Sequence, residues 1–136
     1  MIAIREIDHP VLRVVDMKAM ISFYTGTRGC SVERRHDDIG LVQLRAGRSM
    51  LDLVTVADKL SRPCGAAPGT GGRNLDHFCF RVVRFVKNTI RATPAGANVQ
   101  VGENGSRYGA EREGPSIYIA APEGNTIELN GLLWQG

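Results

Sequence analysis

The chain has 136 residues, of which 43% are hydrophobic and 23% are charged, and its formal net charge is +3. A length of this order builds one compact domain or two small modules that share a core. The sequence lacks an apolar run of the roughly 18 residues that a membrane helix needs, and its N-terminus lacks the apolar stretch of a signal peptide. We therefore expect a cytoplasmic protein without a membrane partner. The basic residues are scattered, which argues against a nucleic-acid partner.

The first half of the chain predicts a strand, a helix and three further strands. Alternating hydrophobicity indicates a strand over residues 3–15, and Asp16 then serves as the N-cap of a helix over about 17–27, which Gly29 ends. Turn residues separate the three short strands that follow, at 30–36, 39–45 and 49–56.

The second half repeats this order after a break. Residues 57–73 are rich in Gly, Pro and Ala and predict a linker. A strand over 75–83 and a helical stretch near 84–95 follow, and the remaining strands are expected at 98–102, 115–121 and 125–130. We thus predict a single domain, 1–136, made of module one (1–56), the linker and module two (74–136), each module with the order βαβββ.

Two pairs of segments nearly duplicate each other. "DHPVLRVV" (8–15) and "DHFCFRVV" (76–83) share Asp, His, Arg and two Val residues at matching positions. "SMLDL" (49–53) likewise aligns with "NTIEL" (125–129), which sets Asp52 against Glu128. The duplication predicts that the first and last strands of the two modules are equivalent.

The repeated strands carry ionisable groups on one face. Because side chains alternate along a strand, His9 and Arg13 share a face in the first copy, as His77, Cys79 and Arg81 do in the second. The opposite face, which carries the phenylalanines of the second copy, is the one expected to pack under a helix. Asp52 and Glu128 also point away from the expected helix-packing face.

Two imidazoles and two carboxylates in equivalent places predict a metal site. Burial of such groups costs several kcal/mol each unless they are paired or bound to a metal. The donor set suits Ni²⁺, Co²⁺, Mn²⁺, Fe²⁺ or Zn²⁺ and does not choose among them. The candidate ligands are His9, Asp52, His77 and Glu128.

Plainer interpretations stay open for several of these residues. His9 taken alone is typical of a satisfied core or surface histidine, and Asp52 is either a ligand or a residue that faces water at a strand end. Arg13 and Arg81 could pair with acidic neighbours. Cys79 is more typical of a small hydrophobic residue than of a nucleophile. The three cysteines are odd in number and lack CxxC spacing, so we expect reduced thiols at Cys30, Cys64 and Cys79.

Two stretches resemble the vicinal oxygen chelate superfamily, which includes glyoxalase I, the fosfomycin-resistance proteins, extradiol dioxygenases and bleomycin-binding proteins. "IDHPVLRVVDMKAMISFYTGTRG" resembles the family's opening strand and helix. "SIYIAAPEGNTIELNG" resembles its closing hairpin, with Ala121 where an Asp is common. The resemblance implies an α+β fold in which two βαβββ modules curl into an eight-stranded open-barrel cleft around a divalent metal ion. It also implies a homodimer.

The resemblance also implies roles for individual residues. By position, His9, Asp52, His77 and Glu128 match the four ligand places, although Asp52 is one methylene shorter than the Glu of glyoxalase I. Arg13 matches an arginine that holds a glutathione carboxylate. The loop 105–116, "GSRYGAEREGPS", would close over the substrate, and its substrate-binding candidates are Arg107 and Tyr108. Arg28 departs from the family by standing where a buried Leu is usual.

The activity implied is that of a metal-dependent lactoylglutathione lyase-like enzyme, of the lyase or isomerase type. Its substrate would be small and chelated through neighbouring oxygens, such as the hemithioacetal of an α-ketoaldehyde with glutathione or another thiol. The metal would stabilise the enediolate formed by proton removal, with Glu128 or Asp52 as the catalytic base. The alternatives are a thiol transferase of the fosfomycin-resistance kind, a dioxygenase, which normally needs a longer chain, and a non-catalytic ligand-binding protein of the bleomycin-resistance type.

Overall fold

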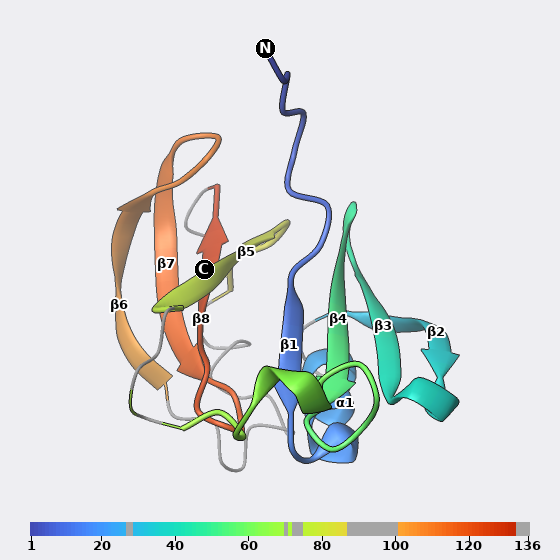
Figure 1. Ribbon diagram of the computed structural model, residues 1–136. Coiled ribbons are helices and arrows are strands. Elements are labelled where there is room, and N and C mark those ends of the chain that lie inside the picture. Colours follow the sequence, from blue (N-terminus) through green and yellow to red (C-terminus); the bar gives the residue numbers. More distant parts are fainter. Residues whose placement is uncertain (27–28, 70, 72–74, 87–100, 133–136) are drawn as a thin grey trace. The chain divides into compact units, whose positions relative to one another are not determined.

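The computed structural model describes residues 1–26, 29–69, 71, 75–86 and 101–132. In this part of the chain, one α-helix and two four-stranded mixed sheets form an α+β fold, which confirms the predicted fold class (Figure 1). The chain divides into two compact units, Met1–Gly69 and Thr70–Gly136. None of the helices in the described ranges is long and apolar enough to cross a bilayer.

The first unit contains one sheet and the helix. Its elements in chain order are β1 (Val11–Val14), α1 (Met17–Gly26), β2 (Ser31–His36), the 3₁₀ turn η1 (Asp37–Ile39), β3 (Leu41–Ala46), β4 (Ser49–Thr55) and the 3₁₀ turn η2 (Arg62–Cys64). The strand order is β1-β4-β3-β2, and β1 is parallel to β4 while the other neighbours are antiparallel. The last strand of the module therefore pairs with the first.

Helix α1 forms where the sequence predicts it. The N–H of Ala19 donates to the Asp16 carboxylate over 3.0 Å, so Asp16 is the expected N-cap. Met20, Phe23 and Tyr24 are buried on one face of the helix. The sheet contributes its own buried row from the alternate positions of β1, and the core of this unit includes Leu12, Val14, Val42, Leu44, Leu51 and Leu53.

The second unit repeats the sheet. Its strands are β5 (His77–Val82), β6 (Val101–Tyr108), β7 (Glu113–Ala120) and β8 (Thr126–Gly131), in the order β5-β8-β7-β6. Strand β5 is parallel to β8. Its described core consists of Phe85, Ile117, Ile119, Ala121, Ile127 and Leu129. Most of the predicted second helix falls on residues 87–100, which lie outside the described residues.

The duplicated segments occupy equivalent places in the two sheets. Val11 lies opposite Asp52 in the first, and Cys79 lies opposite Glu128 in the second. Before β1 begins, the N–H groups of Met50 and Asp52 still donate to the carbonyls of residues 8 and 10, each over 3.0 Å. His9 is thereby held beside β4, as His77 is held beside β8.

Two predicted boundaries are wrong. The first strand begins at Val11 instead of residue 3, because pairing with β4 is what defines it and the apolar residues Ile2, Ile4 and Ile7 stay exposed. The predicted loop 105–116 is mostly a β-hairpin, with β6 extending to Tyr108 and β7 beginning at Glu113 (Figure 1). Backbone pairing between β6 and β7 overrides the turn-forming composition of this segment.

Candidate functional site

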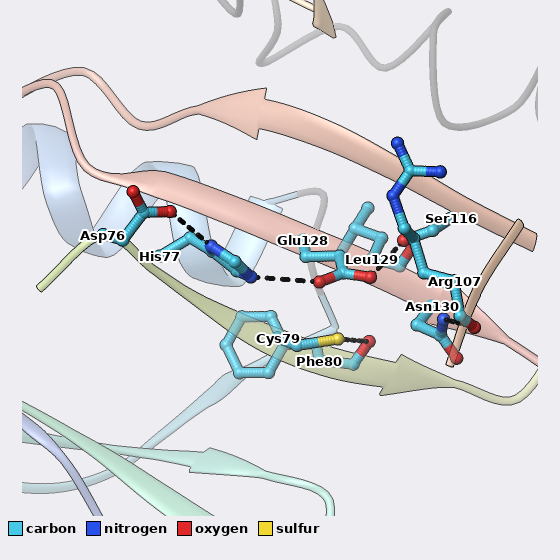
Figure 2. A network of polar contacts seen from close by, with 9 residues as sticks. All are labelled: Asp76, His77, Cys79, Phe80, Arg107, Ser116, Glu128, Leu129 and Asn130. Carbon is cyan, nitrogen blue, oxygen red and sulfur yellow. Dashed lines mark hydrogen bonds and ion pairs between the residues drawn. The ribbon is translucent and has the colours of Figure 1, made fainter. Parts of the chain in front are cut away.

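A chain of polar contacts links three neighbouring strands of the second unit, β5, β8 and β7. His77 lies on β5 between two carboxylates, with Nδ1 2.7 Å from Oδ1 of Asp76 and Nε2 3.1 Å from Oε2 of Glu128 on β8 (Figure 2). Glu128 is only 7% exposed. Two of the predicted ligands, His77 and Glu128, are therefore brought together by the parallel pairing of β5 with β8.

The other oxygen of Glu128 is held by a buried hydroxyl. Ser116 on β7 is fully buried, and its Oγ–H donates to Oε1 of Glu128 in a close hydrogen bond (Figure 2). Each carboxylate oxygen thus has its own partner, which fixes the orientation of the group. The isolated charge of a buried glutamate would be costly, and these two contacts offset that cost.

The carboxylates also affect the histidine. The hydrogen bond with Asp76 raises the pKa of the His77 imidazole, and the charge of Glu128 adds to the rise, while partial burial opposes it. The imidazole ring also contacts Tyr118 edge to face, with the ring centroids 5.3 Å apart. Tyr118 lies opposite Glu128 on β7, and the Arg107 guanidinium lies over its ring at 5.9 Å from the centroid.

The first unit carries the same residue types with different contacts. His9 Nδ1 lies 2.6 Å from Oδ2 of Asp8, and this hydrogen bond raises the pKa of His9, with a smaller rise from the charge of Asp52. Asp52 is 5% exposed. Its Oδ2 accepts a hydrogen bond from Gln43 over 3.1 Å, whereas its Oδ1 is buried and has no hydrogen-bond partner among the described residues.

A cavity of about 380 Å³ lies beside Asp52 within the first unit. Its lining is mostly apolar and comes from β1, β3, β4 and the segment around η2. The lining residues are Val11, Arg13, Leu41, Asp52, Val54, Leu60, Ser61 and Cys64.

Arg13 is bound to the chain that follows β4. Its Nε donates to the Ser61 hydroxyl over 2.6 Å, and its Nη1 donates to the carbonyl of Ala66 over 3.0 Å. Its Nη2 donates to the carbonyls of Ser61, over 3.4 Å, and Gly65, over 2.7 Å. Every guanidinium nitrogen of Arg13 is engaged within the predicted linker.

The remaining predicted substrate residues lie on β6. Tyr108 is 87% exposed at the end of that strand. Arg107 Nη1 donates to the carbonyl of Ser106 over 2.9 Å, in addition to its contact with Tyr118. Arg81 does not pair with a carboxylate in the described structure but binds Asn130 on β8, with Nη1 2.6 Å from Oδ1.

Neither unit holds the predicted set of four ligands by itself. His9 and Asp52 belong to the first unit, and His77 and Glu128 belong to the second. Within each unit, the described residues contain no group of three or more His, Cys, Asp and Glu side chains close enough to hold a metal ion. Each unit thus contains one histidine and one carboxylate of the predicted set of four ligands.

Several contacts in the site were not predicted from the sequence. Asp8 and Asp76 bind the two histidines, and the repeated Asp-His doublet was the available signal. Ser116 and Tyr118 lie two residues apart on β7, so strand alternation combined with the pairing to β8 would have found them. The contact of Gln43 with Asp52 follows from the register of β3 against β4, which the sequence alone does not give.

The comparisons with known proteins agree with this duplicated architecture. Residues 6–129 match the family model of the glyoxalase/bleomycin resistance protein/dioxygenase superfamily. The chain belongs to this superfamily. None of the curated proteins compared with it matches significantly.

Several solved structures share the fold at low sequence identity. A protein from the mobile metagenome of V. pseudocholerae, VPC_CASS1, is 22% identical, with a TM-score of 0.74 over 97% of this chain and 98% of that one. A lactoylglutathione lyase from Agrobacterium tumefaciens is 21% identical, with a TM-score of 0.66 over 96% of each chain. The fosfomycin resistance protein FosX from Mesorhizobium loti is 14% identical, with a TM-score of 0.67 over 95% of this chain and 93% of that one. At these identities the likeness shows the fold, and the reaction has to be argued from the site.

Proposed function

We propose that the protein is a metal-dependent enzyme of the glyoxalase type, with His9, Asp52, His77 and Glu128 as the metal ligands. Its substrate is a small molecule with two neighbouring oxygens, such as the hemithioacetal of an α-ketoaldehyde with glutathione or another thiol. Members of this superfamily commonly use divalent metals and bind small molecules such as thiols. We also propose that the protein acts as a homodimer.

The observation that carries the proposal is shared by both units: an Asp–His hydrogen bond at Nδ1, with a buried carboxylate on the paired strand. Metal-binding histidines usually give one ring nitrogen to a carboxylate and the other to the metal. Asp8 and Asp76 occupy Nδ1 of His9 and His77, which leaves Nε2 as the ligand atom in each case. His77 Nε2 already faces a carboxylate oxygen of Glu128 over 3.1 Å.

The donor set also fits a metal on the side of Asp52. A buried carboxylate oxygen without a partner is costly, and Asp52 Oδ1 is such an atom in the described structure. Imidazole nitrogens and carboxylate oxygens together suit borderline and hard divalent ions. A divalent ion bound to these groups would supply Lewis-acid polarisation of the two substrate oxygens.

Glu128 is the residue best placed to move a proton. In the proposed isomerisation, it takes the proton from the carbon that bears the sulfur and returns it to the neighbouring carbon, so the hemithioacetal becomes a 2-hydroxy thioester without an oxidant. Ser116 keeps one oxygen of Glu128 fixed and buried. Burial excludes water from the base, and Asp52 is the alternative base.

The test starts from metal content. Protein purified without a metal-affinity tag should contain close to one divalent ion per chain, as measured by plasma mass spectrometry, and a His77→Ala variant should lose it. The loaded protein should then convert methylglyoxal and glutathione to the thioester, followed by its absorbance. Protein that takes up no nickel, cobalt, manganese, iron or zinc on titration would overturn the proposal and favour a metal-free ligand-binding protein.

A further inference from the structure

Arg13 and Arg81 occupy equivalent positions in the two modules. Each follows a repeated histidine by four residues and lies on the same strand face as that histidine. Arg13 lies opposite Val54, and Arg81 lies opposite Asn130, in the same register of a parallel ladder. The two arginines are nevertheless used differently, and this difference indicates which of them is open to a ligand.

Arg13 has the contacts of a structural tether. All three of its nitrogens donate to the Ser61 hydroxyl or to the carbonyls of Ser61, Gly65 and Ala66, at distances from 2.6 to 3.4 Å. A carboxylate could reach this guanidinium only by displacing several of these hydrogen bonds. The segment after β4 already accepts the hydrogen bonds that Arg13 would otherwise donate to a bound carboxylate.

Arg81 is held by one nitrogen. Its Nη1 donates to Oδ1 of Asn130 over 2.6 Å and to the carbonyl of Gly131 over 3.4 Å. Its Nε and Nη2 have no hydrogen bond within the described structure, and the residue is half-buried. Asn130 is itself fixed, because its Nδ2 donates to the carbonyl of Arg107 over 3.4 Å (Figure 2). The free edge, formed by Nε and Nη2, is the one that binds a carboxylate side-on with two parallel hydrogen bonds.

The free edge of Arg81 and the proposed base, Glu128, lie on the same face of the second sheet. His77, Cys79 and Arg81 follow one another on one face of β5, and Cys79 lies beside Glu128. Partners in a parallel ladder project to the same side of the sheet, so Arg81, Cys79 and Glu128 share this face.

The absence of a Cβ at Gly109 leaves room for the guanidinium of Arg81. A Cβ added at Gly109, in the turn of the β6–β7 hairpin, would lie 2.8 Å from Nη2 of Arg81 and 3.5 Å from Oδ1 of Asn130. The nearest atom is the end of a flexible side chain, so an alanine at this position would displace Nη2 without forcing the backbone to move.

We propose that Arg81, and not Arg13, binds a carboxylate on the tail of the substrate, while the reacting end lies at His77 and Glu128. The inference rests on the proposed function for the position of the reacting end. It makes Arg81 a specificity-determining residue that selects substrates with an anionic thiol carrier. Arg13 remains in its tether in the bound state.

The test compares two probes that undergo no reaction. S-methylglutathione has free carboxylates, and its dimethyl ester has the same skeleton without them. Binding is measured by calorimetry on the full chain, once with a chelator and once loaded with metal. We expect Arg81→Met to weaken binding of the free acid by roughly tenfold or more and to leave binding of the ester unchanged.

Two further variants control for charge and folding. Arg84→Met removes the same charge at an exposed residue three positions away and should bind both probes like the unaltered protein. Gly109→Ala keeps the charge of Arg81 but displaces Nη2, and it should weaken binding of the acid alone. This variant keeps the proposal testable if Arg81→Met does not fold.

The proposal is overturned if the unaltered protein does not bind the acid or binds acid and ester equally. It is also overturned if Arg81→Met and Gly109→Ala bind the acid normally, or if Arg13→Met alone loses the preference for the acid. None of these measurements needs turnover. A protein that discriminates the probes through Arg81 but forms no thioester would refute the proposed reaction and leave the carboxylate site standing.

Discussion

His77 and Glu128 form a contact between the first and last strands of the second sheet, with Nε2 and Oε2 3.1 Å apart. The contact is supported at both ends, because Asp76 holds the other nitrogen of the imidazole and Ser116 holds the other oxygen of the carboxylate. Neither group needs to reorient before it binds a ligand. Such preorganisation is what distinguishes a prepared site from two polar residues that happen to meet.

Replacing Glu128 by Gln tests the proposed base. The amide keeps the size of the side chain but cannot accept a proton, so we expect thioester formation to fall by roughly a hundredfold or more. Glu113→Gln is the matched control, because Glu113 is an exposed glutamate on β7 whose contact is the Ser106 hydroxyl. Full activity in Glu128→Gln would remove this residue from the chemistry.

Replacing Asp76 by Asn tests the support of the histidine. The neutral amide accepts the Nδ1–H hydrogen bond more weakly than the carboxylate does, so metal affinity should fall by about 10- to 100-fold. Calorimetric titration of chelator-treated protein measures this directly. Asp37→Asn, at an exposed aspartate paired with Arg35, should leave the affinity unchanged. Equal affinities in the two variants would mean that Asp76 does not act on the ligand.

The raised pKa of His77 predicts how the stability of the metal-free protein depends on pH. Protonated His77 is favoured in the folded state by Asp76 and Glu128, so its folded pKa exceeds its ordinary value of 6.5. The resulting stabilisation is complete below that ordinary value and is lost as the pH rises through the higher folded pKa. Free energies of unfolding, measured with a chelator across this range, should decrease more in the unaltered protein than in Asp76→Asn. Parallel curves would contradict the prediction.

A pair of glycine variants tests the packing of the β6–β7 hairpin. A Cβ at Gly114 would lie 1.9 Å from the backbone carbonyl oxygen of Gly131, which cannot move without disturbing β8. Gly114→Ala should therefore lower the free energy of unfolding by about 1–3 kcal/mol. Gly105→Ala is the control, since its Cβ would meet only the flexible end of Arg107. Similar melting temperatures for both variants would show that the contact at Gly114 relaxes easily.

The duplicated segments were enough to predict the main features of the fold. Equivalent strands were predicted from two repeats: Asp-His followed by alternating apolar residues, and the matched "SMLDL" and "NTIEL". The registers of Asp52 and Glu128 confirm this prediction. Helix α1 was predictable because its cap and its apolar face are both local signals.

Long-range contacts were the part that the sequence did not predict. The hairpin of β6 and β7 is rich in Gly, Ser, Arg and Glu, which do not predict strands. Its strands are recognised only from their backbone pairing in the structure. The tether of Arg13 joins residues more than 40 positions apart and depends on where the chain turns after β4. The predicted role of Arg13 in substrate binding stays a prediction, and Arg81 is the alternative residue for that role.

The parallel pairing of β5 with β8 has a consequence for folding. His77 and Glu128 are 51 residues apart in the chain, so their contact closes a long loop and carries a large entropic cost. A fragment that ends before β8 would lack the contact altogether. A ligand bound to both residues would crosslink the first and last strands of the module and slow its unfolding. Removal of that ligand should therefore be visible in the unfolding rate even where the native structure is unchanged.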